Sequence, residues 1–267
     1  MKSLGSDALL AVAERLNIQT LPIVLQAWPQ QDSYDDWHAA HGAAMDDLRA
    51  AGVIDCYGDI EPDLAEALYI LAKPERELVA RVHAENSETR VCVALRAGRC
   101  AAAVRAGAEF EIGPLWSDGS AASLTVPVLS ALGQCDPADT AGFSAPTAEL
   151  ADRLDSAETT GAFADALFAL GACEREATLL GAAFGSCYAV AEIVARASAD
   201  GVTTRASGAV VVYDTDRGRI VAAPMVAPDQ QVWTTVSSGT GHRITQAVST
   251  LLEGLPGGRW LIPPHGN

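Results

Sequence analysis

The spacing of apolar residues changes between helical and strand-like stretches along the chain, and this alternation predicts an α+β fold. Apolar residues three or four positions apart mark amphipathic helices, because they fall on one helix face. One such helix ends at Gly52, a second runs from Pro62 to just before Pro74, a third ends at Gly171, and another begins near Thr240. The apolar positions are Trp37, Ala44, Leu48, Leu64, Leu68, Leu71, Phe163, Leu167, Leu170, Leu180, Phe184, Ile244, Val248, Leu251, Leu252 and Leu255.

Short runs rich in β-branched residues lie between these helices and predict strands. The runs are residues 78–84, 89–96, 202–213, 219–223 and 233–236. Asp214 and Gly218 supply the turn chemistry of a hairpin. Since paired hairpins must hide their edges, we expect one central, mostly antiparallel β-sheet with helical bundles beside it.

One strand unit occurs twice in the chain. When residues 77–94 are placed on residues 192–209, an offset of 115, eight of the 18 positions are identical. The matching residues include Glu77, Val79, Arg81 and Arg90, which fall on Glu192, Val194, Arg196 and Arg205. If the second copy carries five extra residues, Gly98 and Arg99 fall on Gly218 and Arg219, and an apolar helix follows in each copy.

The repeat predicts a single pseudo-symmetric domain spanning residues 1–267. Its two halves cover about residues 1–135 and 136–267, and each half brings its own helical bundle to the shared sheet. Residues 134–147, which are rich in Pro, Thr and Ser, are the expected linker between the halves.

The charge balance argues against nucleic acid and membranes as partners. The chain has 34 acidic and 18 basic residues and a formal net charge of -16. Such a surface repels phosphate backbones and anionic lipids. No stretch approaches the roughly 20 apolar residues of a membrane span, so we expect neither nucleic-acid binding nor membrane insertion.

The beginning of the chain and its cysteines favour a cytoplasmic protein. Asp7, Glu14 and Arg15 interrupt the region where a secretory signal would need an apolar core. The six cysteines are scattered without a C-x-x-C pair. We therefore expect reduced thiols.

No catalytic or metal-binding constellation stands out. His38 and His41 lie three residues apart on a predicted helix, but spacing marks no third metal ligand, so they are interpreted as surface positions. His242 follows a glycine-containing turn, where Thr240 as an ordinary helix cap is favoured over an anion site. The chain has no G-x-S-x-G motif. We therefore expect no catalytic residues, no metal and no cofactor.

Several short segments, taken in chain order, match a known family. They are residues 21–25 (Leu-Pro-Ile-Val-Leu), expected as the first strand, residues 46–54, 60–62, 73–74, 93–96 and 218–220, and residues 255–260 (Leu-Pro-Gly-Gly-Arg-Trp). In this order, across essentially the whole chain, the sequence resembles the EspG family. These are the ESX (type VII) secretion-associated proteins of mycobacteria and related actinobacteria.

The resemblance implies a cytosolic chaperone without catalysis or cofactor. Members of the family bind the helical tip of the PPE subunit in a PE–PPE heterodimer, keep it soluble and direct it to its own secretion system. The family fold, a central sheet with a helical bundle on each half, agrees with the repeat. In the family the client is held by one face of the sheet, by the loop between the second and third strands, and by the bundle of the second half.

Carried over to this chain, that loop is residues 85–88, which is short for the family. Strand alternation places Arg81 and His83 on one face, and it places Arg90 and Arg96 on one face around Cys92 and Ala94. The predicted partner-binding residues are Arg81, His83, Glu85, Asn86, Ser87, Glu88, Arg90, Arg96, Arg196 and Arg205.

Two other functions stay open from the sequence. One is a small-ligand-binding protein or enzyme with a pocket between the halves, and the other is a homodimeric scaffold without a PE–PPE client. A deep polar cleft with converging titratable groups would favour the first, and a large self-complementary interface would favour the second. A broad, shallow, partly apolar surface would favour the chaperone.

Overall fold

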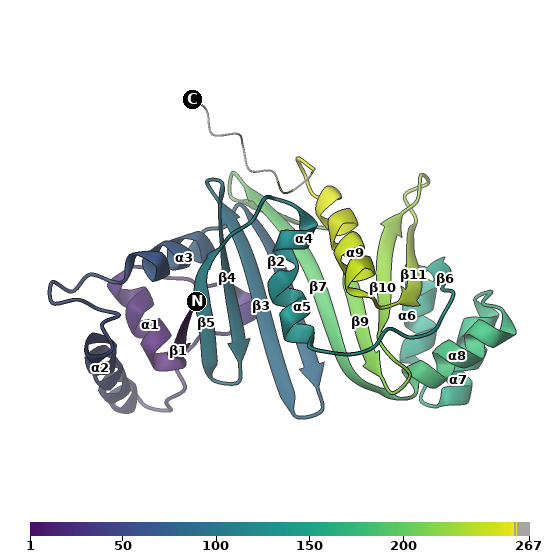
Figure 1. Ribbon diagram of the computed structural model, residues 1–267, viewed down its shortest axis with the longest axis horizontal. Coiled ribbons are helices and arrows are strands. Elements are labelled where there is room, and N and C mark those ends of the chain that lie inside the picture. Colours follow the sequence, from purple (N-terminus) through teal and green to yellow (C-terminus); the bar gives the residue numbers. More distant parts are fainter. Residues whose placement is uncertain (259, 261–267) are drawn as a thin grey trace.

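One antiparallel sheet runs through the whole computed structural model, which describes residues 1–258 and 260 (Figure 1). Within this range eleven strands form the order β1-β5-β4-β3-β2-β7-β9-β10-β11-β6, and β8 pairs with β7. The pairings between these strands are all antiparallel, which confirms the predicted α+β fold. The predicted second half ends at residue 267, and residues 259 and 261–267 lie outside the description.

The first half contains a strand, three α-helices, four strands and two short helices. They are β1 (Lys2–Gly5), α1 (Ser6–Arg15), the 3-10 helix η1 (Ile23–Leu25), α2 (Tyr34–Ala50), α3 (Pro62–Ala72), β2 (Arg76–Ala84), β3 (Ser87–Arg96), β4 (Arg99–Ala106), β5 (Glu109–Leu115), α4 (Ala121–Leu124) and α5 (Val126–Leu132).

The second half repeats this order of elements. They are β6 (Phe143–Pro146), α6 (Thr147–Asp155), α7 (Thr160–Ala169), α8 (Glu174–Phe184), β7 (Cys187–Ala199), β8 (Val202–Arg205), β9 (Val210–Thr215), β10 (Ile220–Val226), β11 (Val232–Ser238) and α9 (Gly241–Glu253). β8 and β9 together take the place of β3. The prediction that the two halves form one domain, with a boundary near residue 135, stays a prediction.

The two halves meet where β2 pairs with β7. Glu77 lies opposite Arg196, Arg81 lies opposite Glu192, and Val79 lies opposite Val194. The offset of 115 that superposes the repeats relates residue 79 to residue 194, so this valine pairs with its own copy. Such a contact of one surface with its equivalent is isologous. A quasi-two-fold axis therefore passes through the Val79–Val194 pair.

Alternate residues of the central strands enter different cores, as the period of two in a strand requires. Leu78 and Ala80 belong to a core that α4, α5 and α9 complete on one face. Val79 belongs to the core of the opposite face, which α1, η1, α2 and α3 cover. Ile220 and Ala222 pack under α6, α7 and α8 on that same face. The two bundles thus lie at opposite ends of the sheet (Figure 1).

The prediction of a first strand at residues 21–25 is wrong, because this segment forms η1. The Leu25 N–H donates to the Pro22 carbonyl at 2.9 Å and closes a tight turn. Arg90 and Arg105 on the sheet donate to the carbonyls of Val24 and Leu25 at 3.0 and 2.9 Å. Residues 21–25 take no part in the strand pairings of the sheet. The first strand is β1 instead.

The single strand predicted at residues 202–213 is interrupted in the structure. β8 ends at Arg205 and β9 begins at Val210. Gly208 has φ of +141° and packs so closely on Pro224 that an added Cβ would lie 2.9 Å from the proline Cβ. Because Pro224 has no N–H to offer a neighbouring strand, the pairing of β9 with β10 ends at Ala222.

The predicted linker at residues 134–147 contains secondary structure. Its last part forms β6 and the first residue of α6, and β6 pairs with β11 at the edge of the sheet. The prediction that a helix begins near Thr240 is confirmed, because the Thr240 hydroxyl accepts from the Arg243 N–H at 3.2 Å. This is the ordinary cap expected from the sequence.

Candidate functional site

On the face that carries Val79, the middle strands lie between the two helical bundles and expose charged side chains. Arg81, His83 and Arg205 are exposed, and Glu192 and Arg196 are half-buried. The strand register places all five on this face. We call these five residues the charged strip.

The charged strip retains unused hydrogen-bond donors. His83 Nδ1 lies 3.1 Å from the Glu88 carboxylate, and Arg205 Nη2 lies 3.1 Å from the Glu192 carboxylate. In the part of the chain that the structure describes, no side-chain hydrogen bond is formed by Arg81 or Arg196. Their guanidinium groups can therefore donate hydrogen bonds to a carboxylate or carbonyl of a bound partner.

Glu77 lies on the same face between the strip and the core. It is half-buried, and this burial raises the pKa of its carboxyl group. Arg196 opposes the shift by attracting the ionised form. The raised pKa means that the ionised carboxylate is not fully stabilised by its surroundings.

The structure divides the predicted partner-binding residues into two sets. Glu85, Asn86 and Ser87 are exposed at the hairpin between β2 and β3, next to His83. Arg90 and Arg96 instead bind within the chain. Arg90 is only 7% exposed and bonds to Glu88 and to the Val24 carbonyl. Arg96 donates to the Tyr69 carbonyl of α3 at 3.0 Å.

An apolar slot, which sequence reasoning missed, opens under α6 and α8. Its volume is about 200 Å³. Its walls include Leu150, Leu154, Phe184, Val211, Tyr213 and Val236. In the first half, η1 packs on β2, β3 and β4, and its Val24 and Leu25 are buried. The second half has only residues 156–159 between its first two helices, so it has no segment to match η1.

The apolar slot is continuous with the charged strip. The pairing of β7 with β9 places Val211 next to Glu192, and Glu192 in turn lies opposite Arg81. Tyr213 occupies the next position on the same face, beside Val190. A ligand that fills the apolar slot can therefore also reach the guanidinium groups of the charged strip.

The chemistry of the apolar slot suits an apolar side chain. Tyr213 is the titratable group among the lining residues, and burial raises its pKa to about 12, so it stays neutral. The Tyr213 ring packs edge-on against Phe184 with centroids 5.1 Å apart. In the described residues, no three His, Cys, Asp or Glu side chains are grouped so as to hold a metal ion.

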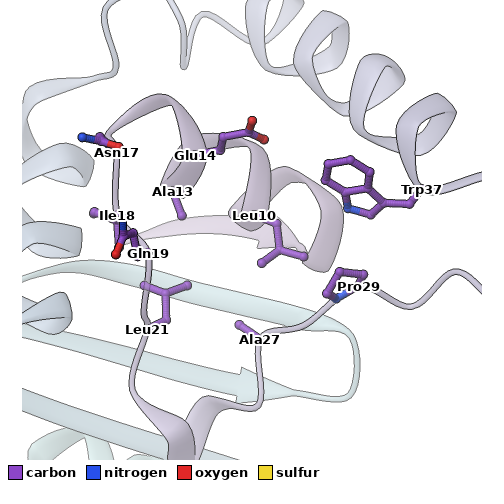
Figure 2. A pocket seen from close by; sticks show the side chains of 10 residues that line it. All are labelled: Leu10, Ala13, Glu14, Asn17, Ile18, Gln19, Leu21, Ala27, Pro29 and Trp37. Atoms are coloured by element: carbon purple, nitrogen blue, oxygen red, sulfur yellow. The ribbon is translucent and has the colours of Figure 1, made fainter. Parts of the chain in front are cut away.

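A second pocket lies between α1 and α2, at the other end of the sheet (Figure 2). The predicted surface histidine His41 is near it, with Nε2 3.4 Å from the Glu14 carboxylate and its ring 5.4 Å from that of Trp37. His38 is exposed.

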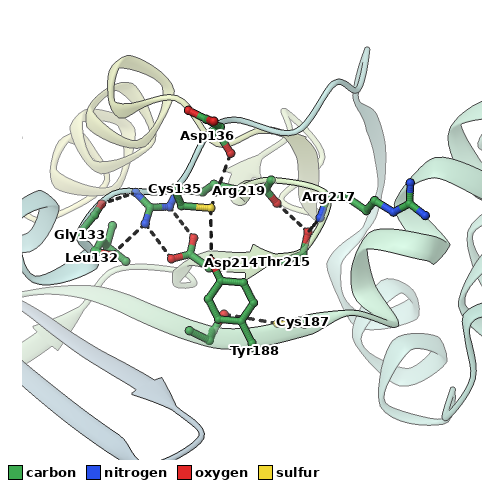
Figure 3. A network of polar contacts seen from close by, with 12 residues as sticks. Leu132, Gly133, Cys135, Asp136, Cys187, Tyr188, Asp214, Thr215, Arg217 and Arg219 are labelled. Atoms are coloured by element: carbon green, nitrogen blue, oxygen red, sulfur yellow. Dashed lines mark hydrogen bonds and ion pairs between the residues drawn. The ribbon is translucent and has the colours of Figure 1, made fainter.

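A buried ion pair fastens the second half to the segment that arrives from the first (Figure 3). Arg219 donates to both carboxylate oxygens of Asp214, at 2.5 and 2.7 Å. It also donates to the Leu132 carbonyl at 2.9 Å. The hydrogen bond to Asp214 raises the pKa of Arg219 above its ordinary value, so the guanidinium group is charged. It holds β9 and β10 against the end of α5.

All six cysteines are free. None of the helices in the described part of the chain combines the length and the apolar character needed to cross a bilayer.

The fold and the candidate site together define an α+β protein of two similar halves on one sheet, with one open face beside an apolar slot. The model of the EspG family matches residues 6–250. The chain belongs to the EspG family, and the resemblance seen in the sequence is confirmed.

Individual relatives match over nearly the whole chain. ESX-1 secretion-associated protein EspG1 of Mycobacterium tuberculosis is 28% identical over 260 residues, which cover 96% of this chain and 87% of the relative. ESX-3 secretion-associated protein EspG3 of Mycolicibacterium smegmatis is 29% identical and covers 96% and 88%. The Mycobacterium tuberculosis chaperone EspG5, solved with a PE25–PPE41 dimer, shares the fold with a TM-score of 0.80. Its sequence identity is 21%, and the match covers 97% of this chain and 98% of that one.

Proposed function

We propose that this protein is a cytosolic chaperone of ESX (type VII) secretion. It binds the helical tip of the PPE subunit in a PE–PPE heterodimer, keeps that heterodimer soluble and directs it to its secretion system. Family membership, the names of the relatives and the EspG5 complex with PE25–PPE41 support this proposal.

The observation that carries the proposal is the apolar slot beside the charged strip. In the first half, η1 inserts Val24 and Leu25 against the equivalent strands. The second half leaves the corresponding place open. An apolar turn of the client would complete the second half as η1 completes the first. Burial of two such side chains removes exposed apolar surface that would otherwise aggregate.

The charged strip gives the complex its orientation. Arg81 and Arg196, which form no side-chain hydrogen bond to another described residue, can bind carboxylates or helix C-terminal carbonyls of the client. The hairpin at Glu85 and Asn86 is short, so its contribution to binding is small. Arg90 and Arg96 hold η1 and α3, and they act on the client only through the shape of the surface.

The test is co-expression with a PE–PPE pair encoded beside this protein, followed by size-exclusion chromatography. We expect a ternary complex. Val211→Asp, which places a charge in the apolar slot, and the double charge reversal Arg81→Glu with Arg196→Glu should each remove it.

Arg49→Glu on α2 is the matched control, because Arg49 is exposed and far along the chain from the site. It should leave the complex intact. Absence of a ternary complex with any neighbouring pair would overturn the proposed function. Intact complexes with both site variants would show that the docking face lies elsewhere.

A further inference from the structure

The helix α2 is anchored more loosely than its counterpart in the second half. The counterpart α7 packs so closely on α8 that a Cβ on Gly181 would lie 2.7 Å from the Ala164 nitrogen. In α2 the two buried residues, Ala44 and Leu48, lie in the second half of the helix, and its helix contact is with α1. The first two turns of α2 therefore stand over α1 with their side chains available.

Beneath these turns lies the α1–α2 pocket, with a volume of about 280 Å³. Leu10, Ile18, Pro29 and Trp37 form apolar walls, and Glu14 lies at the edge. Figure 2 shows Leu10, Pro29 and Trp37 converging from α1, from the segment before α2 and from α2 itself.

The walls of the α1–α2 pocket are held in place without a ligand. Gln31 donates from its side-chain amide to both carboxylate oxygens of Asp7 at 3.0 Å. This bond ties the segment that contains Pro29 to the start of α1. A pocket formed in advance binds with a smaller loss of conformational entropy.

A second aromatic ring, that of Tyr34, lies beside the pocket residue Trp37. The Tyr34 and Trp37 ring centroids are 5.7 Å apart, and Tyr34 is 71% exposed. Tryptophan and tyrosine are frequent anchors of protein interfaces. Their faces also attract cations, and arginine more often than lysine. No function described above uses this aromatic surface.

The charge around the pocket is negative. Residues 1–60 contain nine acidic and three basic residues. Each basic residue is bound elsewhere: Lys2 to Glu61 at 2.8 Å, Arg15 to the Gly58 carbonyl at 2.8 Å, and Arg49 to Asp46 at 2.9 Å. The ion-pair partner of Glu14 within the described residues is His41, at 3.4 Å. The mouth therefore presents a carboxylate without an arginine or lysine of its own.

We propose that the α1–α2 pocket binds an arginine-bearing segment of a second protein partner. The alkyl part of the arginine lies along Leu10 and Pro29, and its guanidinium group stacks on Trp37 and pairs with Glu14. The planar guanidinium can make both contacts at once, whereas an ammonium group cannot stack. The pocket and the apolar slot are at opposite ends of the sheet, so this partner can bind while a client is held.

The test follows the Trp37 indole N–H by NMR, with its resonance assigned by Trp37→Phe. The probes are N-acetyl-Leu-Arg-amide and its neutral isostere N-acetyl-Leu-citrulline-amide. We expect a saturable shift with tighter binding of the arginine probe. Glu14→Gln should weaken that binding about two- to fivefold, the size of a partly exposed ion pair, and Glu14→Lys should weaken it further.

Asp165→Asn is the control, because it removes one exposed carboxylate from α7 in the other bundle. It should not change the affinity. Sheet amide resonances report whether each variant is folded. No saturable shift, equal affinity for the two probes, or unchanged affinity in Glu14→Gln and Glu14→Lys would overturn the proposal. None of these measurements involves a client.

Discussion

Arg99 and Arg219 occupy the same place in the two repeats but have different environments. Arg99 is exposed and forms an ion pair with Glu66 of α3. Arg219 is 6% exposed and is enclosed by Asp214 and the carbonyls at the end of α5. The difference arises because residues 133–142, which run between the halves, pass over Arg219 alone. Arg99 thus binds a helix, α3, whereas its equivalent Arg219 binds the connection between the halves.

Removing Asp214 should be far more costly than removing a neighbouring carboxylate. Asp214→Ala leaves the buried Arg219 guanidinium without its partner, and we expect a loss of about 3–5 kcal/mol in the free energy of unfolding. Urea denaturation measures this loss. Asp216→Ala, at an exposed position two residues along, is the control and should change the value by less than about 0.5 kcal/mol. Similar effects of both substitutions would contradict the assigned role of the ion pair.

Glu77 should make stability depend on pH in a defined direction. Its folded-state pKa is raised from the ordinary 4.5, so the folded state binds this proton more tightly than the unfolded state. The resulting penalty is absent below the ordinary pKa, grows as pH rises through the raised pKa and is complete at neutral pH. Glu77→Gln removes it. We expect the Glu77→Gln variant to have a higher Tm than wild type at pH 7 and nearly the same Tm near pH 4. A lower Tm of the variant at pH 7 would contradict the destabilising role of the ionised Glu77 carboxylate.

At the scale of residues, strand alternation gave the face of each side chain but not its burial. Arg81 and Arg90 are both predicted as partner-binding residues, and only Arg81 is exposed. What covers Arg90 is η1, whose Val24 carbonyl lies 66 positions earlier in the chain. No local pattern around Arg90 carries that information.

At the scale of elements, the two bundles differ in how tightly their helices pack. Gly181→Ala should destabilise the α7–α8 pair, because the new methyl group would lie 2.7 to 2.9 Å from Ala164 backbone atoms. We expect a loss of about 1–3 kcal/mol. Gly161→Ala on α7 is the matched control, since no atom lies within 4 Å of its added Cβ, and a helical Gly→Ala change in open space should stabilise by up to about 1 kcal/mol. Thermal unfolding of both variants measures the changes in Tm. Equal changes in Tm would contradict the close packing of α7 on α8.

Helices with clear end signals could be predicted, and segments fixed by distant contacts could not. Gly52 and Gly171 follow α2 and α7 with positive φ, as the sequence indicated. Residues 21–25 have the apolar and β-branched composition of a strand, yet Pro22 and the two sheet arginines make them η1. The apolar slot was missed for a related reason. It exists because a segment present in the first half has no counterpart in the second, and the alignment of the repeats began only after the helices.

At the scale of the whole molecule, the shared sheet favours unfolding in one step. β2 and β7 pair over nine residues each, and the core under α5 and α9 draws residues from both halves. We propose that residues 1–267 form a single domain, whose halves of about 1–135 and 136–267 do not unfold separately. Calorimetry should give one transition with equal calorimetric and van't Hoff enthalpies. Two resolved transitions would instead show that the halves are independent domains.

The valine pair at the quasi-two-fold axis bears on how such a chain could have originated. A strand that lies antiparallel to its own copy, in register about one shared position, has the geometry by which identical subunits associate. A half-length ancestor could have formed the same strand pairing as a homodimer. Gene duplication with fusion would then join the two subunits through a connection such as residues 133–142. After fusion, the sequence of each copy can change independently of the other. One copy could acquire η1 and become closed, while the other stayed open to receive a segment from a different protein.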